Sequence, residues 1–464
     1  METKTYAAFE SFVEILIETN HIIHNVQIVK TVNNGYGLAY YQGKTVFVEN
    51  ALTGDIADLE LLYTKKKHIY AKIHKIIEPS PLRKNRRCML SDRCGACNWV
   101  DIDYENQLKL KNEIIDGIYQ NINKSVVIHP IIASELVDFY RNKSFFPLAL
   151  EKNKPVYGMY QRGSHNVIRQ ESCFLHPPLY NEIADEIISY IKNTNSLIYD
   201  EETHTGNLKH IGIRSNHDMS EILLIIVSKT SKLSFTQLLV KRIKKKFPEI
   251  CGIIQNIQPA KTNVILGERD KIIYGRKYIN DRIGNLNLQI HYKSFFQVNI
   301  KQAELMYKQI TNLSGNNKTI IDAYSGIGTI GLFLSSKHNK VISIECNPEA
   351  VMNAKNNALL NSINNIEFIE GETENVLPTI IKNKDIDLLV FDPPRKGLDL
   401  KTIELIAKLK IKEIIYMSCN PITQNRDLQH FFQLGYSTND IYSYDMFPHT
   451  WHIETLCHLK RKAE

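Results

Sequence analysis

Residues 322–331 read Asp-Ala-Tyr-Ser-Gly-Ile-Gly-Thr-Ile-Gly, between an apolar segment and a segment with helical periodicity. Gly326 and Gly328 allow a tight turn and a close approach of the backbone to a ligand. Glu345 ends the next strand-like segment, 23 positions after Asp322, where a carboxylate can accept hydrogen bonds from ribose hydroxyls. The pattern predicts a nucleotide-type cofactor site. It leaves open an NAD-dependent oxidoreductase and a glycine turn that binds nothing.

The segments around this turn alternate between strand and helix. Strands are expected at residues 319–323, 341–345, 386–391 and 413–417, and helices at residues 327–336 and 348–361. Strands that alternate with helices of this length are typical of a parallel, doubly wound sheet. We therefore predict a Rossmann-like α/β domain over residues 291–464.

The N-terminal part of the chain has a different pattern. Residues 24–80 contain short strand-like segments with turns at Gly35 and Gly54. Roughly five short strands in so few residues are typical of a small barrel, and we predict an OB-like β-barrel over residues 21–80. Residues 81–290 mix strands and helices without a clear period, which predicts a central α+β domain.

The chain has 464 residues, and 57 Lys and Arg against 50 Asp and Glu give a net charge of +7. The basic residues gather in four clusters, at residues 65–67, 83–87, 241–246 and 460–462. One cluster is often solvated surface charge, but four of them beside other nucleic-acid signals favour contact with phosphates. Because no apolar run reaches the ~18 residues that cross a bilayer and no signal-peptide pattern occurs, we expect a cytoplasmic protein without a membrane partner. No obligate protein partner is evident.

A second motif, Asp392-Pro-Pro-Arg-Lys-Gly397, directly follows the apolar segment 386–391. Two prolines stiffen this loop, which lies at the carboxyl end of a predicted parallel strand, where such sheets bind their ligands. A strand-ending loop without a ligand can have the same pattern. The pairing of a glycine turn with Asp-Pro-Pro favours a methyltransferase over an oxidoreductase, and it does not identify the atom that is methylated.

A third motif, Ser418-Cys419-Asn420-Pro421, follows the next predicted strand, so Cys419 also lies at the carboxyl edge of the sheet. A lone cysteine is commonly a packing residue. Its position beside the predicted cofactor site makes Cys419 a candidate nucleophile, for which the site should lower the thiol pKa from its usual ~8.5. Glu454, in His449-Thr-Trp-His-Ile-Glu454, is the candidate base, and the alternative interpretation is an exposed strand glutamate.

The cysteines are unevenly distributed along the chain. Three of the eight, Cys88, Cys94 and Cys97, fall within ten residues, and Cys173 is a candidate fourth ligand. In a cytosolic chain such crowding favours a metal site over disulfide bonds. Four thiolates can hold tetrahedral zinc or an iron–sulfur cube, and the spacing does not separate the two.

These motifs together resemble the RNA uracil-C5 methyltransferase family, and the resemblance covers nearly the whole chain. It also includes Tyr140-Arg-Asn-Lys143 and Ser294-Phe-Phe-Gln-Val-Asn299. Residues 35–55 are similar to the TRAM domain, a small RNA-binding barrel. The resemblance implies that the chain forms 5-methyluridine in RNA with S-adenosylmethionine as the methyl donor.

The resemblance also assigns roles to residues. Cys419 would add to C6 of a uracil and so make C5 reactive, and Glu454 would remove the C5 proton so that the cysteine can leave. The residues that it places at S-adenosylmethionine or in its pocket are Gln297, Tyr324, Glu345 and Asp392. The chain departs from the family pattern at two positions near the expected cofactor pocket. Relatives often carry Asn in place of Thr329, and Asn or Asp in place of Glu372, so neither residue is included in this set.

The same resemblance favours a [4Fe–4S] cluster over zinc at Cys88, Cys94, Cys97 and Cys173. Such a cluster would be structural or help to bind RNA, because methyl transfer needs no electron. Family members with both the barrel and the cluster tend to resemble the 23S ribosomal RNA enzymes, so the implied substrate is 23S rRNA. The alternatives are the same chemistry on tRNA and a non-catalytic RNA-binding protein.

Overall fold

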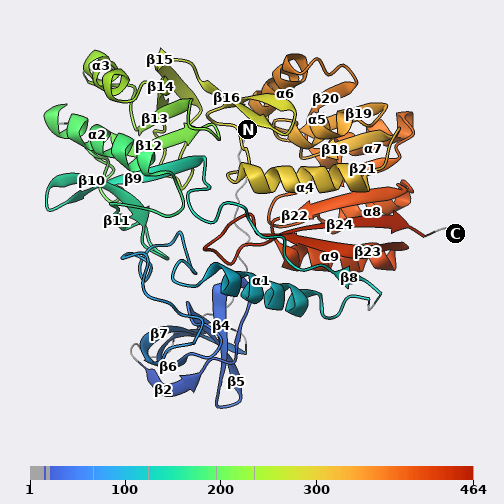
Figure 1. Cartoon of the computed structure of the whole chain (residues 1–464), viewed down its shortest axis with the longest axis horizontal. Helices are drawn as coiled ribbons and strands as arrows, with labels where there is room; N and C mark the ends of the chain where they lie inside the picture. Colours follow the sequence, from blue (N-terminus) through green and yellow to red (C-terminus); the bar gives the residue numbers. More distant parts are fainter. Residues whose placement is uncertain are drawn as a thin grey trace. The chain divides into compact units, whose positions relative to one another are not determined.

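The computed structural model describes residues 15–16, 21–65, 67–123, 125–194, 196–234 and 236–462 (Figure 1). The chain separates into two compact units. The first unit comprises Met1–Arg87, Asn98–Gly117 and His449–Trp451, and the second comprises Cys88–Cys97, Ile118–Pro448 and His452–Glu464. The predicted division into domains at residues 80 and 290 stays a prediction.

The first unit contains a curled seven-stranded sheet, in agreement with the predicted OB-like barrel. Its strands are β1 (Ile15–Leu16), β2 (Ile22–Gln27), β3 (Lys30–Thr31), β4 (Tyr36–Tyr41), β5 (Lys44–Glu49), β6 (Ile56–Lys65) and β7 (His68–Glu78). The strand order is β1-β6-β7-β5-β4-β3, and β2 also pairs with β6. Alternate residues such as Ala39, Val46 and Ala71 are fully buried and form the barrel core. Helix α1 (Tyr104–Tyr119) begins in this unit.

The second unit contains a further seven-stranded sheet, with the order β11-β10-β9-β12-β13-β14-β15. Its strands are β9 (Lys143–Glu151), β10 (Lys154–Tyr160), β11 (Val167–Arg169), β12 (Leu208–Ser215), β13 (Ile222–Ser228), β14 (Ile250–Ile257) and β15 (Arg269–Gly275). Apolar side chains of α2 (Pro178–Thr194) and α3 (Thr236–Lys246) share one core with this sheet. The helix α3 forms the crossover between the parallel strands β13 and β14.

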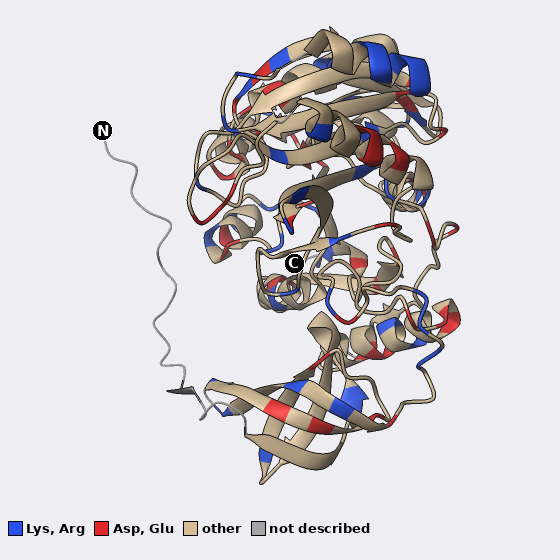
Figure 2. Ribbon diagram, turned by 90° about the vertical axis from the view of Figure 1, so that its left-hand side faces the viewer, with Lys and Arg blue, Asp and Glu red and all other residues tan. Residues whose placement is uncertain are grey.

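The basic cluster at residues 241–246 falls on α3, where Lys and Arg are frequent (Figure 2). Part of this cluster is paired within the protein. Arg242 Nε donates to a carboxylate oxygen of Glu186 at 2.7 Å, and Lys246 Nζ lies 3.2 Å from the other oxygen. These two cations therefore join α3 to α2.

The C-terminal sheet of the second unit confirms the predicted Rossmann-like α/β class. Its strands are β8 (Val127–Ile128), β18 (Thr319–Ala323), β19 (Lys340–Glu345), β20 (Ile366–Glu370), β21 (Leu388–Phe391), β22 (Glu413–Ser418), β23 (Tyr436–Tyr444) and β24 (Glu454–Arg461). The order is β20-β19-β18-β21-β22-β24-β23-β8, with the first five parallel and β24 antiparallel to both of its neighbours. A hairpin of β16 (Tyr278–Ile283) and β17 (Leu286–His291) packs beside this domain.

Helices lead into β18 or connect successive strands of this sheet. They are α4 (Ile300–Leu313), α5 (Thr329–Ser335), α6 (Pro348–Leu360), α7 (Thr373–Asn383), α8 (Leu400–Lys408) and α9 (Pro421–Gln433). The helix expected from residue 327 begins at Thr329, because Gly326 and Gly328 have φ of +56° and +78° and continue the turn. None of the helices in the described ranges is long and apolar enough to span a bilayer.

The strand order contains one reversal. From β18 the chain moves to β19 and β20 on one side, and then returns to β21 on the other side of β18. Right-handed crossovers then place the helices of the two halves on opposite faces and leave a crevice above the carboxyl ends of β18 and β21. The fold therefore places a ligand site where the glycine turn and Asp392 lie.

Candidate active site

The carboxyl edge of the sheet carries the predicted catalytic residues. Asp392 follows β21, and Cys419 follows the neighbouring strand β22. Strand β24 runs antiparallel to β22, with Ser418 paired to Thr455. Glu454 is the first residue of β24 and so lies at the same edge as Cys419. The antiparallel pairing brings together two residues that are 35 positions apart in the sequence.

Two carboxylates hold the glycine turn after β18. The backbone N–H of Gly326 donates to Glu345 at 2.9 Å, and the N–H of Gly331 donates to Asp322 at 2.8 Å. Burial raises the pKa of Asp322 to about 7 because it disfavours the charged form. Glu345 thus lies beside the turn, as its place at the end of β19 predicted.

A small cavity of about 40 Å³ lies against this turn. It is lined by Phe295, Phe296, Gln297, Tyr307, Tyr324, Ser325, Gly326, Ile327, Thr329, Ile330 and Asp392. Tyr324 has a φ of +61°, and its hydroxyl donates to Glu374 at 2.6 Å. The buried Gln297 accepts a hydrogen bond of 3.1 Å on its backbone carbonyl from Asn142. The structure therefore brings three of the four predicted cofactor residues into one cavity, with Glu345 bonded to its wall.

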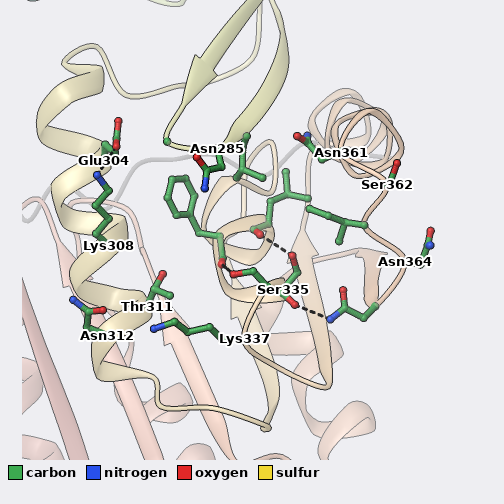
Figure 3. Close-up of a pocket in the computed structure, with 17 residues that line it drawn as sticks. Asn285, Glu304, Lys308, Thr311, Asn312, Ser335, Lys337, Asn361, Ser362 and Asn364 are labelled. Atoms are coloured by element: carbon green, nitrogen blue, oxygen red, sulfur yellow. Dashed lines mark hydrogen bonds and ion pairs between the residues drawn. The ribbon is translucent and has the colours of Figure 1, made fainter.

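A larger cavity of about 800 Å³ lies elsewhere in the same domain (Figure 3). Side chains of α4 such as Glu304 and Lys308 line it, together with Ser335, Lys337 and Asn361 from the ends of α5 and α6. Those helix ends precede β19 and β20, so this cavity lies toward the amino edge of the sheet. Ligands of such sheets bind at the carboxyl edge, and the candidate active site is therefore the smaller cavity.

The loop that carries Cys419 is tied to the Asp392 loop. The side chain of Asn420 caps α9 by accepting from the N–H of Ile422 at 3.3 Å. Its amide nitrogen donates to the backbone carbonyl of Arg395 at 3.1 Å, and the Thr423 hydroxyl donates to the same carbonyl at 3.3 Å. These bonds fix the position of Cys419 relative to the loop that follows β21.

The surroundings of Cys419 do not lower its pKa. Partial burial of the thiol raises its pKa to about 11, and the negative charges of Glu454 and Asp392 act in the same direction. The positive charge of Arg395 and a backbone hydrogen bond favour the thiolate. The prediction of a lowered pKa was therefore wrong for the protein without RNA, because the sequence did not show that two carboxyls lie beside the thiol.

Glu454 is 3% exposed, which excludes its interpretation as an exposed strand glutamate. Burial raises its pKa well above the usual value, and the negative charge of Asp392 raises it further, while Arg395 opposes both effects. The pKa of Asp392 is itself raised to about 7 by burial and then by Asp322. A carboxyl group with a raised pKa is a stronger proton acceptor once it is ionised.

Arg395 is the site residue to which sequence reasoning gave no role. It lies three residues after Asp392 in the quoted motif, and its charge acts on both Cys419 and Glu454. Its guanidinium also lies 3.5 Å from the ring of His452. Its place in the Asp392 motif could have identified Arg395, because the loop after β21 lies beside the loop of Cys419 after the neighbouring strand β22.

The four cysteines of the predicted metal site influence one another. Burial raises the pKa of Cys97 well above its usual value, and the other three cysteines of the set raise it further. Their sulfur atoms therefore lie in one neighbourhood. In the described part of the chain, no group of three or more His, Cys, Asp or Glu side chains is arranged to hold a metal ion.

The loops around these cysteines offer hydrogen-bond donors to sulfur. The backbone N–H of Ala96 points to the sulfur of Cys94 at 3.5 Å, and that of Leu175 points to the sulfur of Cys173 at 3.4 Å. Arg162 donates to the backbone carbonyls of Cys94 and Cys97 at 3.2 and 3.0 Å. Such N–H···S contacts suit sulfur atoms that carry negative charge, as in cluster ligands.

Comparison with known proteins shows the family of the chain. The model of the tRNA (uracil-5-)-methyltransferase family matches residues 103–462. A protein of Bacillus cereus described as an uncharacterized RNA methyltransferase is 36% identical over 451 residues, which cover 96% of this chain and 98% of that protein. A second such protein, from Clostridium acetobutylicum, is 37% identical over 436 residues, which cover 92% of this chain and 95% of that protein.

One solved structure shares most of the fold. It is the Pyrococcus abyssi tRNA (uracil-54, C5)-methyltransferase in complex with S-adenosyl-L-homocysteine, with a TM-score of 0.74 over 94% of this chain and 100% of that chain. Its sequence is 23% identical, so the likeness concerns the fold. The family match and the relatives, which align over nearly their full length, show that the chain belongs to the tRNA (uracil-5-)-methyltransferase family, whose members methylate C5 of uracil in RNA.

Proposed function

We propose that the protein transfers a methyl group from S-adenosylmethionine to C5 of a uridine in RNA, with Cys419 as the nucleophile and Glu454 as the base. One observation carries this proposal. The half-buried thiol of Cys419 and the buried carboxyl of Glu454 lie at the carboxyl edge of the sheet, where the charge of Glu454 acts on the thiol and the charges of Asp392 and Arg395 act on both groups. A nucleophile and a proton acceptor at one edge are what methylation at C5 requires.

The proposed cofactor pocket is the cavity at the glycine turn. S-adenosylmethionine, when bound, supplies an electrophilic methyl group on a sulfonium centre. Gln297, Tyr324 and Asp392 line this cavity, and Glu345 has its carboxylate beside Gly326, where ribose hydroxyls can donate to it. The Pyrococcus abyssi enzyme was solved in complex with S-adenosyl-L-homocysteine, which supports S-adenosylmethionine as the cofactor.

The proposed reaction has three steps on the uracil ring. The thiol of Cys419 loses its proton to solvent, its thiolate forms a bond to C6, and the electrons of the C5–C6 double bond move toward O4. The enolate then takes the methyl group at C5, and the donor would leave as the neutral thioether S-adenosylhomocysteine. Glu454 finally removes the C5 proton, the C6–sulfur bond breaks with its electron pair returning to sulfur, and the double bond re-forms.

Charge at the site decides how readily these steps occur. The raised pKa of Cys419, about 11, disfavours the thiolate in the protein without RNA. Arg395 favours the thiolate that attacks C6. The raised pKa of Glu454 makes its carboxylate a strong acceptor for the C5 proton.

We propose 23S ribosomal RNA as the substrate, on the basis of the barrel and the four cysteines that the chain combines. Protein-free 23S RNA fragments should then accept methyl groups, and transfer RNA should not. The family description and the Pyrococcus abyssi structure favour transfer RNA as the second candidate. Efficient methylation of transfer RNA alone would reverse the choice.

A test in cells complements this assay. We would map 5-methyluridine in total RNA from a strain that lacks the gene, and from the same strain carrying the wild-type protein or Cys419→Ala. One or more 5-methyluridines of 23S RNA should disappear and return only with the wild-type protein. An unchanged 5-methyluridine map in the deletion strain would contradict the proposal.

We also propose that Cys88, Cys94, Cys97 and Cys173 hold a [4Fe–4S] cluster. Three observations support this group. The four thiols lie in one neighbourhood, and backbone N–H groups point to the sulfur atoms of Cys94 and Cys173. The guanidinium of Arg162 also binds the backbone carbonyl of Cys94. Zinc is the alternative, and metal analysis separates the two.

A further inference from the structure

The outer surface of the barrel departs from the usual pattern of a solvated sheet. Along β4, β5, β6 and β7 the inward residues are apolar and buried, and the outward residues alternate with them. Outward positions in such a strand are normally polar. Here six of them, which we call the aromatic face, are Tyr36, Tyr40, Phe47, Tyr63, His68 and Tyr70.

Cross-strand pairing places these rings side by side. Phe47 on β5 pairs with Tyr70 on β7, which pairs in turn with Tyr63 on β6. The ring centroids of Tyr63 and Tyr70 are 4.8 Å apart at 17°, a stacked pair, and those of Phe47 and Tyr70 are 5.5 Å apart. Tyr36 meets Tyr70 edge-on at 6.1 Å. Five of the six rings therefore form one contiguous cluster, which includes His68 at 5.4 Å from Phe47, and Tyr40 lies at its edge, paired across the strands with Thr45.

One end of the aromatic face is both exposed and basic. Tyr40 is 61% exposed, and it shares a cross-strand row with His68 and Lys65 through Thr45. Lys67 is exposed in the adjacent hairpin. At the other end Lys72 is paired with Glu60 at 2.9 Å, whereas Lys65 and Lys67 lie at the same end as Tyr40.

We propose that the aromatic face binds unpaired bases of the RNA substrate by stacking, with Tyr40 as the outermost platform and Lys65 and Lys67 beside the phosphates. Every base presents a π-face, so rings on a sheet surface with lysines at the border suit single-stranded RNA of many sequences. This proposal rests on the proposed RNA substrate. It adds that the barrel holds a single-stranded segment by its bases.

The test measures binding of the full-length protein to a fluorescent single-stranded RNA of about ten nucleotides, without cofactor. Tyr40→Ala should weaken binding by about 5- to 150-fold, the range measured for loss of one base–aromatic stack. Tyr40→Phe keeps the ring and should bind like the wild type. Because the Tyr40 ring is largely exposed, neither change should alter thermal unfolding, which serves as the folding control.

Two further arms separate stacking from charge. The slope of log affinity against log salt should stay unchanged in Tyr40→Ala and become shallower by about 0.7 in Lys65→Gln, which loses one phosphate contact. An abasic strand should bind the wild type and Tyr40→Ala equally weakly. Equal affinity of Tyr40→Ala and wild type for the intact strand would overturn the proposal, as would a preference for duplex RNA. Since no turnover is measured, an inactive protein that still binds through Tyr40 would contradict only the proposed function.

Discussion

The side-chain amide of Asn420 donates a hydrogen bond of 3.1 Å to the backbone carbonyl of Arg395, which joins the loop of Cys419 to the loop of Asp392. Asn420 also caps α9 through its side-chain oxygen. One residue therefore has two separable tasks. Its oxygen stabilises a helix, and its nitrogen holds the nucleophile's loop in register with the cation that favours the thiolate.

Substitutions at Asn420 separate these tasks. Asn420→Ala should lower the free energy of unfolding by about 1 kcal/mol, because the cap of α9 is lost, and should also reduce kcat. Asn420→Asp keeps an oxygen for the cap but has no donor for the Arg395 carbonyl, so it should reduce kcat with wild-type stability. Chemical denaturation and steady-state kinetics on the same preparations would show this. A fully active Asn420→Asp would mean that the loops keep their positions without the bond.

The charges around Cys419 predict its reactivity toward alkylating agents. In the protein without RNA the rate should rise with pH beyond pH 9, because the pKa of the thiol is about 11. Arg395→Gln should slow alkylation at pH 8.5, and Asp392→Asn should accelerate it, since one change removes the favourable charge and the other an unfavourable one. Mass spectrometry of the Cys419 peptide distinguishes it from the exposed Cys346. Equal rates in both variants would contradict this description of the site.

Asp322 predicts a pH dependence of stability. Its pKa of about 7 in the folded protein lies above its usual value of 3.8, so folding favours the protonated form. The stability that this group contributes is fully present below pH 4 and is lost as the pH rises through 7. The Asn side chain in Asp322→Asn can still accept the hydrogen bond from the N–H of Gly331. The free energy of unfolding of this variant should therefore fall less between pH 4 and pH 8 than that of the wild type. Parallel stability curves for the two proteins over this range would show that the pKa of Asp322 is not raised.

The cysteine set predicts a metal content. Protein purified without oxygen should be brown and contain about four irons per chain. Cys94→Ser should lose the iron and part of the solubility, because its loop then lacks the support of the cluster. Cys251→Ser is the matched control, since Cys251 is half-buried and lies outside the set, and it should keep its iron. A measured content of one zinc and no iron per chain would contradict the [4Fe–4S] assignment and indicate a zinc site.

The parallel half of the catalytic domain could be predicted from the sequence. The strand expected at residues 319–323 is Thr319–Ala323 in the structure, because short apolar segments between glycine turns and helical patterns have few other arrangements. The strands Tyr436–Tyr444 and Glu454–Arg461 were not predicted. They are antiparallel and lack the strand–helix alternation from which the other strands were identified.

The electrostatics of the site could not be predicted in the same way. Asp392 and Cys419 were identified as candidates because each motif follows a predicted strand at one sheet edge, and Glu454 was identified from its own motif and the family resemblance. The direction of the Cys419 pKa shift depends on which charges lie beside the thiol, and strand pairing decides that. A sequence shows which groups are present at an edge but not the balance of burial and charge between them.

The most direct measurement uses RNA that carries 5-fluorouracil at the target position. Fluorine at C5 cannot leave as a cation, so attack by Cys419 should trap a covalent protein–RNA complex, visible as a shifted band on a denaturing gel. Cys419→Ala should give no complex and no turnover. Glu454→Gln should still allow addition and methyl transfer on ordinary RNA, and a methylated covalent intermediate should accumulate because the C5 proton is not removed. Normal turnover by Glu454→Gln would contradict only the assignment of Glu454 as the base that removes the C5 proton. Substantial activity of Cys419→Ala, or no trapped complex with the wild type, would contradict the proposed mechanism.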